Sequence, residues 1–271
     1  SYLSVWNTGN NQFYQLATEA FPNTTLSGNQ KMAIVATDKK YKPAFKEDYA
    51  DFSLVNVKTG ASKLLYTRLQ AGFYTSPQTS PDGKYLIYFK DKNWFTYNIA
   101  TEQNTNITGT IKSNFWNTRD DHPATKPPFG LGGWIKGDKE VLLYDEYSIW
   151  AVSLDGSSAR KIADGDKEEI ALRVNRVEFE ETYSAYGDKT KKFGYHQYEN
   201  GKTSKLIFED LQVSRLAKAQ DANVFSYIKQ DYDLSPELYI SDNFTKEEKA
   251  ATTNPQQQNY YWGKSKLVSF T

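Results

Sequence analysis

Short apolar segments separated by polar turns recur along the whole chain. In the clearest copy, the turn SPDG leads into one apolar segment, Tyr85 to Phe89, and after a short polar linker into a second, Trp94 to Ile99. Pro-Asp-Gly is a typical turn sequence, and so short a linker favours an antiparallel hairpin. The pattern therefore predicts paired β-strands.

Two further copies follow the same order of turn, strand and partner strand. LSGNQKMAIVATD predicts a strand over 32–36 with a partner over 52–57, and WIKGDKEVLLYDE predicts one over 141–144 that continues into YSIWAVSLDG. Aligning the turn-to-strand junctions at Lys31, Lys84 and Lys139 gives spacings of 53 and 55 residues. Such spacings are at the long end for four-stranded propeller blades.

Two weaker copies complete the series. One predicts strands over 193–198 and 204–208, divided by the hairpin signal Asn200-Gly201, and the other predicts strands over 224–228 and 237–240. Five units thus cover nearly the whole chain. Only two short helices are expected, near 244–250 and 11–17.

The strands are apolar on both faces, as in YLIYF and VLLY, so each small sheet needs a neighbour on either side. Radial stacking provides this, whereas a sandwich predicts stricter alternation of apolar and polar residues. We therefore predict an all-β propeller of about five four-stranded antiparallel units. It forms a single domain or a partial propeller over 1–271, and a sandwich is the second choice.

The composition of the chain argues against several classes of function. Basic and acidic residues number 33 each, so no net charge favours nucleic acid, and the absence of cysteine excludes disulfides and thiolate metal sites. We expect no membrane insertion, because no apolar run approaches the ~20 residues of a spanning helix, and the first residues do not form a signal peptide. The only methionine is Met32, and both ends are interpreted as cuts in a longer protein.

Three segments resemble a known family. SPDGKYLIYF is similar to the blade motif of prolyl oligopeptidase-like peptidases and Tol-type propellers. DDHPATKPPFGLGGWIKGDKEVLLYDEYSIWAVSLDG, from Asp120 to Gly156, resembles a stretch of large bacterial members of the peptidase family, the dipeptidyl or acylaminoacyl peptidases. NPQQQNYYWGKSKLVSFT resembles their last propeller strand, before the catalytic domain.

The resemblance implies a serine peptidase in which an α/β-hydrolase domain carries a Ser-Asp-His triad and the propeller admits only short peptides. It also implies a periplasmic or secreted bacterial protein. This chain contains no G-x-S-x-G nucleophile elbow, and its only histidines are His122, in a loop, and His196, in a strand. We therefore expect the catalytic domain to be absent from the chain, and the chain alone to have no enzymatic activity.

Carboxylates offer a second chemistry, because five-bladed propellers also include glycosidases that use acidic residues. The candidates are Asp120, Asp121, Asp145 and Glu146. Turns select aspartate for local reasons, so Asp145-Glu146 is better explained as a hairpin turn and Asp120-Asp121 as loop residues. No metal or other cofactor is expected, because adjacent loop residues such as Asp120, Asp121 and His122 rarely converge on one ion.

Two further groups are candidates for binding. In VEFEE, Glu180 and Glu181, with Glu178, are weak candidates to hold the amino terminus of a peptide, as a glutamate pair does in some family members; a solvated strand edge explains them better. Trp116, Pro127, Pro128 and Phe129 are candidates for the interface with the hydrolase domain, with blade packing as the alternative. Trp134 and Trp150 are expected in the core.

The first hypothesis is therefore a non-catalytic propeller region that gates peptide access to a hydrolase domain and braces it. That domain of the same protein and short peptides are the expected partners. A stand-alone propeller scaffold for protein binding, of the Tol or WD-repeat type, is the alternative, and a five-bladed glycosidase is the third hypothesis.

Overall fold

The structure is a computed structural model that describes residues 2–72, 75–135, 137–175, 182–199, 202–251, 254–268 and 270. The chain divides into two compact units, and each is described by itself. The first contains residues 1–146 and 150–160, and the second contains residues 147–149 and 161–271.

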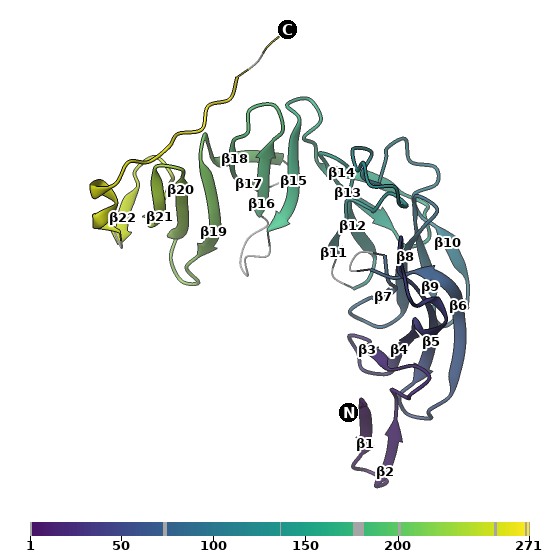
Figure 1. Cartoon of the computed structure of the whole chain (residues 1–271). Coiled ribbons are helices and arrows are strands. Elements are labelled where there is room, and N and C mark those ends of the chain that lie inside the picture. The colour runs from purple at the N-terminus through teal and green to yellow at the C-terminus, as the bar shows by residue number, and fades with distance from the viewer. Residues whose placement is uncertain are drawn as a thin grey trace. The chain divides into compact units, whose positions relative to one another are not determined.

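The first unit begins with a two-stranded sheet and continues with four-stranded antiparallel sheets (Figure 1). The two-stranded sheet pairs β1 (Ser4–Asn7) with β2 (Gln12–Gln15). The strands that follow are β3 (Asn23–Leu26), β4 (Met32–Thr37), β5 (Tyr49–Asn56), β6 (Ser62–Gln70), β7 (Gln78–Thr79), β8 (Tyr85–Lys90), β9 (Asn93–Asn98) and β10 (Asn104–Asn106). A 3₁₀ helix over Lys39–Tyr41 precedes β5.

A third four-stranded sheet carries the boundary between the units, and two more belong to the second unit. The boundary sheet contains β11 (Leu131–Trp134), β12 (Glu140–Tyr144), β13 (Ile149–Ser153) and β14 (Ala159–Ala163). The second unit has β15 (Ile170–Asn175), β16 (Thr182–Gly187), β17 (Phe193–Glu199), β18 (Lys202–Glu209), β19 (Gln212–Lys218), β20 (Phe225–Asp231), β21 (Leu234–Ser241) and β22 (Glu248–Ala251), followed by a 3₁₀ helix over Pro255–Asn259.

In every four-stranded sheet, strands that follow one another in the chain are neighbours in the sheet. This meander is the arrangement of a propeller blade. The described residues thus form five four-stranded units where the sequence predicts five, and the predicted fold class is confirmed. Most strands begin and end within a few residues of the predicted bounds.

The central sheets of the first unit are covered on both faces, as their apolar strands require. On β8, Leu86 and Tyr88 belong to a core cluster shared with the β3–β6 sheet. Ile87 and Phe89, on the other face, belong to a cluster shared with β11–β13. Successive side chains of a strand point to opposite faces, so an uninterrupted apolar strand needs two neighbouring sheets.

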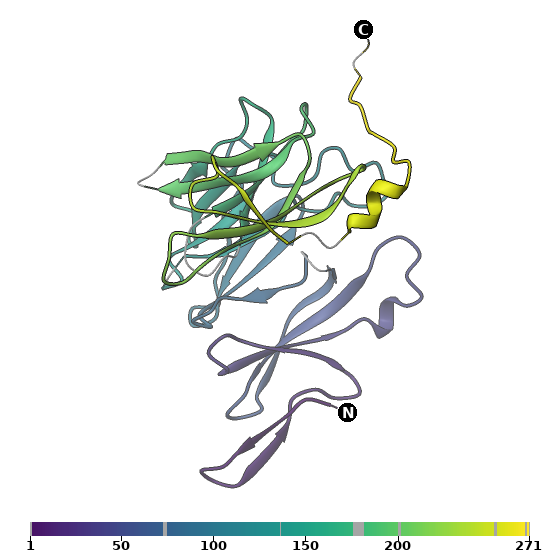
Figure 2. The ribbon, with the colours of Figure 1, turned by 90° about the vertical axis from the view of Figure 1, so that its left-hand side faces the viewer.

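The β1–β2 sheet differs, because only one of its faces is covered. It adjoins the β3–β6 sheet in both views of the ribbon (Figures 1 and 2). Val5 packs there against a cluster that includes Val35 and Val55. On the other face, Trp6 and Phe13 lie opposite each other in the ladder and are 63% and 68% exposed.

Serine side chains shape the turns that the sequence predicts. The Ser80 hydroxyl accepts hydrogen bonds from the backbone N–H groups of Lys84 and Tyr85 at 3.1 and 3.2 Å. The Ser27 hydroxyl accepts one from Met32 at 3.1 Å. A polar side chain thus closes each turn and places the first residue of the next strand.

The repeated turns also contact one another. The Asn29 amide donates to the backbone oxygen of Asp82 at 2.5 Å, and the N–H of Asp82 donates to the Asp138 carboxylate at 3.1 Å. A Cβ atom on Gly28 would lie 2.3 Å from the backbone oxygen of Pro81. The turn sequences therefore link neighbouring sheets as well as neighbouring strands.

Neither predicted helix is present. Residues 12–15 form β2 instead, after a turn at Asn11, whose φ is 53°. Near 244–250, the Asn243 side chain accepts from the N–H groups of Thr245 and Lys246. Phe244 has a φ of 58°, which a helix does not tolerate, and the chain continues as β22. Both helix predictions were wrong because turn chemistry and strand pairing dominate.

The strand expected at the end of the chain is also absent from the described residues. Pro255–Asn259 forms a 3₁₀ helix, with proline in its first turn, and 260–268 follow without strand pairing. No described helix has the length and hydropathy needed to cross a membrane.

Candidate functional site

The proline-rich loop between β10 and β11 is closed at its base by backbone pairing. Trp116 and Pro128 form an isolated bridge, the N–H of Asn117 donates to the oxygen of Pro127 at 2.7 Å, and the N–H of Phe129 donates to that of Phe115 at 3.1 Å. Backbone hydrogen bonds therefore anchor the base of the loop in the first unit.

The four interface candidates lie at this base. Pro128 is buried, and Trp116, Pro127 and Phe129 are half-buried. Trp116 packs against the core cluster, with the Lys92 ammonium 5.2 Å from its ring centroid. Part of their apolar surface is therefore buried by packing within the first unit. Contact with a hydrolase domain stays a prediction. Trp134 and Trp150, expected in the core, are half-buried and pack against the same cluster.

The tip of the loop is held by Glu47, which lies just before β5. Its carboxylate accepts hydrogen bonds from the N–H of Thr125 and from the Tyr49 hydroxyl. The bond from Tyr49, and then that from Thr125, hold the pKa of Glu47 below its ordinary value. An ionised carboxylate thus ties the loop to the first four-stranded sheet.

The four acidic candidates are placed in or beside this loop, and three have structural partners. Asp145 is buried and accepts hydrogen bonds from the Ser113 hydroxyl at 2.7 Å and the Trp150 indole at 2.6 Å. Glu146 forms an ion pair with Arg119 at 2.6 Å. The predicted turn at Asp145-Glu146 is confirmed, between β12 and β13.

Asp120 accepts hydrogen bonds from the backbone N–H and the ring Nδ1 of His122, both at 3.0 Å. The backbone bond, foremost, keeps the pKa of Asp120 below its ordinary value. A glycosidase acid needs the opposite shift, because it must be protonated when it meets its substrate. Asp121 is exposed. Asp120, Asp145 and Glu146 thus take part in structural contacts.

The second histidine is buried on β17. His196 lies edge-on to Phe208, with ring centroids 6.0 Å apart, and its Nε2 has no hydrogen-bond partner among the described residues. Burial, reinforced by the positive charge of Lys205, lowers the pKa of His196 to about 4. The histidine expected in a strand is thus a buried residue that packs on an aromatic ring.

Glu180 and Glu181, together with Glu178, lie outside the described residues. Among the residues that are described, no group of three or more His, Cys, Asp or Glu side chains could hold a metal ion.

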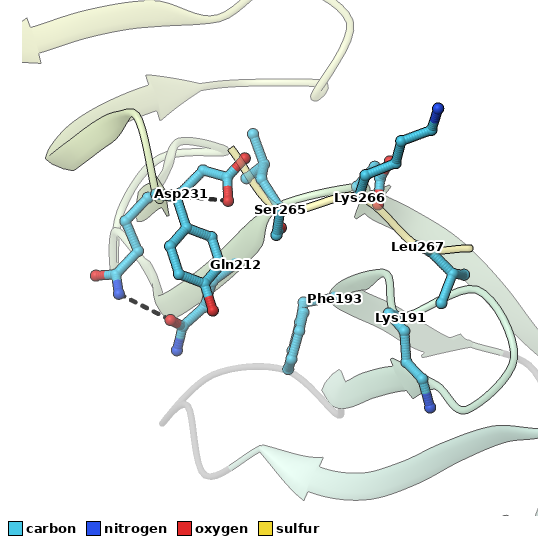
Figure 3. A pocket seen from close by; sticks show the side chains of 11 residues that line it. Lys191, Phe193, Gln212, Asp231, Ser265, Lys266 and Leu267 are labelled. Carbon is cyan, nitrogen blue, oxygen red and sulfur yellow. Dashed lines mark hydrogen bonds between the residues drawn. The ribbon is translucent and has the colours of Figure 1, made fainter. Parts of the chain in front are cut away.

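A groove of about 820 Å³ lies in the second unit, where the ends of several strands meet the C-terminal segment (Figure 3). Its lining is mixed, with two carboxylates, two lysines, two amides and several apolar side chains. The lining residues are Lys191, Phe193, Asp210, Leu211, Gln212, Gln230, Asp231, Tyr232, Ser265, Lys266 and Leu267.

One end of the groove is acidic. Gln212 and Gln230 face each other across β19 and β20, and their amides are joined by a hydrogen bond of 2.8 Å. Asp231 follows Gln230 at this end of the strand pair, whereas Asp210 lies between the two ends, because it directly follows Glu209, the ladder partner of Phe193. One oxygen of Asp231 accepts the N–H of Tyr232 at 2.8 Å.

The other end is basic. Lys191 comes from the turn between β16 and β17, and Phe193 is the first residue of β17. Figure 3 shows Lys191 and Lys266 on the side opposite Asp231, with Phe193 between the two sides. Lys191 lies 3.3 Å from Asp188, and the Lys266 side chain extends outward from the groove.

The third wall is the extended segment over 265–267. Its backbone N–H and C=O groups form no hydrogen bonds with the described residues. Sequence reasoning missed this groove. Its only signal was charged residues at two hairpin turns, in the link between β18 and β19 and in the C-terminal segment, and a sequence does not show that these segments meet.

No protein-family profile matches the chain. No curated protein matches it either.

Solved structures show similarity of fold. A protein assigned as a dipeptidyl aminopeptidase IV from Bacteroides ovatus matches with a TM-score of 0.51 and 13% sequence identity, over 90% of this chain and 41% of that chain. An oligogalacturonate lyase from Vibrio parahaemolyticus matches with a TM-score of 0.47 and 13% identity, over 92% of this chain and 70% of that one.

The β-propeller domain of the Trilobed protease from Pyrococcus furiosus matches with a TM-score of 0.43 and 15% identity, over 93% of this chain and 77% of that domain. At such identities, a match shows the fold alone, and this chain spans less than half of the Bacteroides ovatus protein. The chain is therefore a β-propeller region in fold, and its family is not shown at the level of sequence.

Proposed function

We propose that this chain is the non-catalytic propeller region of a prolyl oligopeptidase-like serine peptidase, where it gates the access of peptides to a hydrolase domain of the same protein and braces that domain. The observation that carries the proposal is the series of five four-stranded meander sheets. The fold similarity to the Bacteroides ovatus protein and the blade motif SPDGKYLIYF support it.

The arrangement of the histidines also supports a non-catalytic role. A serine nucleophile needs a base within hydrogen-bond reach, and that base needs an orienting carboxylate. His122 has such a carboxylate in Asp120, but its side chain is 77% exposed on a loop and the chain has no G-x-S-x-G elbow. His196 is buried against Phe208.

The purified chain tests the non-catalytic role. We expect it to release no more nitroaniline from dipeptidyl nitroanilides than a buffer control. Hydrolysis that a fluorophosphonate abolishes would contradict the proposal.

The whole protein tests the peptidase part. We expect a fluorophosphonate probe to label it at a serine outside residues 1–271, and we expect cleavage of peptides of a few residues but not of long or folded ones. A whole protein that reacts with no such probe, or that cleaves long and short peptides equally well, would contradict this part.

A further inference from the structure

A groove of about 640 Å³ lies in the first unit, lined by the turn that joins β8 to β9 and by residues 108–116, which follow β10. Its lining combines the ammonium groups of Lys92 and Lys112, the amides of Asn93 and Asn114 and the indole of Trp116. We call it the Trp116 groove. Its volume is in the range of small-molecule sites.

The charge that lines the Trp116 groove is mainly positive. Lys92 and Lys112 are exposed and form no ion pair with any described residue. Asp91, a carboxylate of the lining, lies 3.9 Å from the ammonium of Lys90, which is not part of the lining. Because Lys90 offsets the charge of Asp91, the two ammonium groups of the groove favour an anion.

A further carboxylate lies close to this groove. The Ser113 hydroxyl, which belongs to the lining, donates to Asp145 at 2.7 Å. Asp145 is 4% exposed and also accepts the indole N–H of Trp150 at 2.6 Å. Two donors thus compensate its charge, and Asp145 weakens the attraction of the two lysines for an anion without cancelling it.

The backbone of Phe115 supplies a donor that has no partner. Phe115 lines the groove and is 1% exposed, and its N–H forms no hydrogen bond with the described residues. Its carbonyl, in contrast, accepts the N–H of Phe129 at 3.1 Å. Buried backbone N–H groups are nearly always paired, with protein, water or a ligand. The unpaired N–H therefore points to an acceptor that comes from outside the chain.

Two apolar side chains complete the lining. Trp116 and Ile111 are half-buried and pack against the core cluster of the first unit. The Lys92 ammonium lies 5.2 Å from the ring centroid of Trp116, so positive charge and aromatic surface adjoin in the groove. A ligand that carries an oxyanion on an apolar ring can contact both.

We propose that the Trp116 groove binds a small organic oxyanion, a carboxylate or phosphate group carried by an apolar ring. The oxyanion contacts Lys92 and Lys112 and accepts the N–H of Phe115, and the ring lies against Trp116 and Ile111. Lysine binds carboxylate and phosphate groups alike, as a point charge. The two lysines are exposed, so each ion pair contributes little and salt weakens it. We therefore expect affinities in the millimolar range that fall as salt is raised.

The experiment uses the full 271-residue chain, labelled with ²H and ¹⁵N and observed by NMR. Phenylacetate and phenyl phosphate are titrated, with uncharged phenylacetamide as the matched ligand. We expect at least one of the two anions to give saturable shifts at groove residues, to move the Phe115 amide proton downfield, and to bind at least fivefold more tightly than phenylacetamide. Equal binding of phenylacetamide, an unmoved Phe115 amide, or no saturable binding of either anion would overturn the proposal.

Ligands without the ring test the apolar contact. Acetate and inorganic phosphate should bind at least threefold more weakly than the ring-bearing anions that match them. Equal binding would contradict the part assigned to Trp116 and Ile111. A comparison of phenylacetate with phenyl phosphate then shows which oxyanion the groove prefers, and a preference for either one supports the proposal.

Variants locate the site. Lys92→Gln and Lys112→Gln should each weaken binding of the anion by about threefold, as expected for exposed ion pairs. Lys31→Gln with Lys58→Gln removes two exposed lysines of the same unit outside the groove and should leave binding unchanged. An equal effect of this control pair, or no effect of either groove variant, would contradict the assignment. Unchanged unfolding midpoints confirm that the variants are folded.

Discussion

Two buried ionisable residues show how the polar groups of this chain support its fold. Asp145 sits beneath the base of the long loop, where its carboxylate joins the loop through Ser113 to β13 through Trp150. His196 is buried within the second unit, against Phe208. The first is satisfied and ties two segments together, whereas the second remains neutral because its surroundings exclude water.

Replacing Asp145 with alanine should lower the free energy of unfolding by about 3 kcal/mol, because two half-buried donors, on Ser113 and Trp150, lose a buried, charged acceptor. Urea unfolding followed by tryptophan fluorescence measures this loss. Asp121→Ala, in the exposed part of the loop, is the matched control and should change stability by less than about 0.5 kcal/mol. Equal losses in the two variants would refute the structural role of Asp145.

His196 predicts a loss of stability in acid. Its folded pKa is about 4 and its ordinary value is 6.5, so the unfolded chain binds the proton more readily. Above pH 6.5 His196 costs the folded state nothing. As the pH falls from 6.5 toward 4, the free energy of unfolding decreases, and at pH 4 the loss is about 3 kcal/mol. Lys205 and Glu168, paired at 2.8 Å, are the charges that act on it.

Unfolding curves at pH 7 and pH 4 test this loss in the wild type and in His196→Phe. The variant should lose about 3 kcal/mol less than the wild type over this range, because it has no imidazole to protonate. His122→Gln, at the exposed histidine, should keep the wild-type pH dependence. Identical pH dependence in His196→Phe and the wild type would show that His196 is not held neutral.

At the scale of elements, the turns reverse the chain and also connect neighbouring sheets. The turn that contains Gly28 lies against the backbone of Pro81, and the Asn29 side chain crosses to the next turn. Sheets of this repeat are therefore linked at their turns as well as through apolar faces.

Gly28→Ala tests this contact. The added methyl group would lie 2.3 Å from the backbone oxygen of Pro81, which cannot move without disturbing its own turn, so we expect a loss of about 2 kcal/mol or more. Gly9→Ala is the control, because its methyl group would meet only the Asn7 side chain, at 3.4 Å. Thermal unfolding compares the two, and similar midpoints would show that the turns are not tightly packed.

At the scale of the whole molecule, a stack of sheets leaves an uncovered face where it ends. The outer face of β1–β2 is such a face, since Trp6 and Phe13 stand exposed side by side on a sheet of only two strands. Exposed apolar patches and unpaired strand edges both favour association.

We therefore expect the isolated chain to self-associate at high concentration, and Trp6→Thr with Phe13→Thr to shift it toward the monomer. Sedimentation velocity over a range of concentrations measures the effect. Phe45→Ser is the control, because Phe45 is 94% exposed but lies on a loop away from a sheet face. An unchanged association constant in the double variant would exclude this face as the cause.

Local chemistry determined most of the fold. Ser-Pro-Asp-Gly and its relatives form turns because their side chains and backbone angles favour them, and apolar runs such as YLIYF form strands with both faces buried. The same local reasoning identified the turn at Asp145-Glu146. It failed near Phe244 and Asn11, where a short segment reads equally well as helix or strand and pairing with a neighbour decides.

Tertiary structure alone decided which side chains meet. The lining of the groove in the second unit comes from two hairpin turns, from the link between β18 and β19 and from a segment near the end of the chain. The hydrogen bond between Thr125 and Glu47 joins residues 78 positions apart. A sequence specifies that such residues lie in turns, because turns depend on a few neighbours. Which turns face one another depends on how sheets stack, and that is settled by packing over the whole unit.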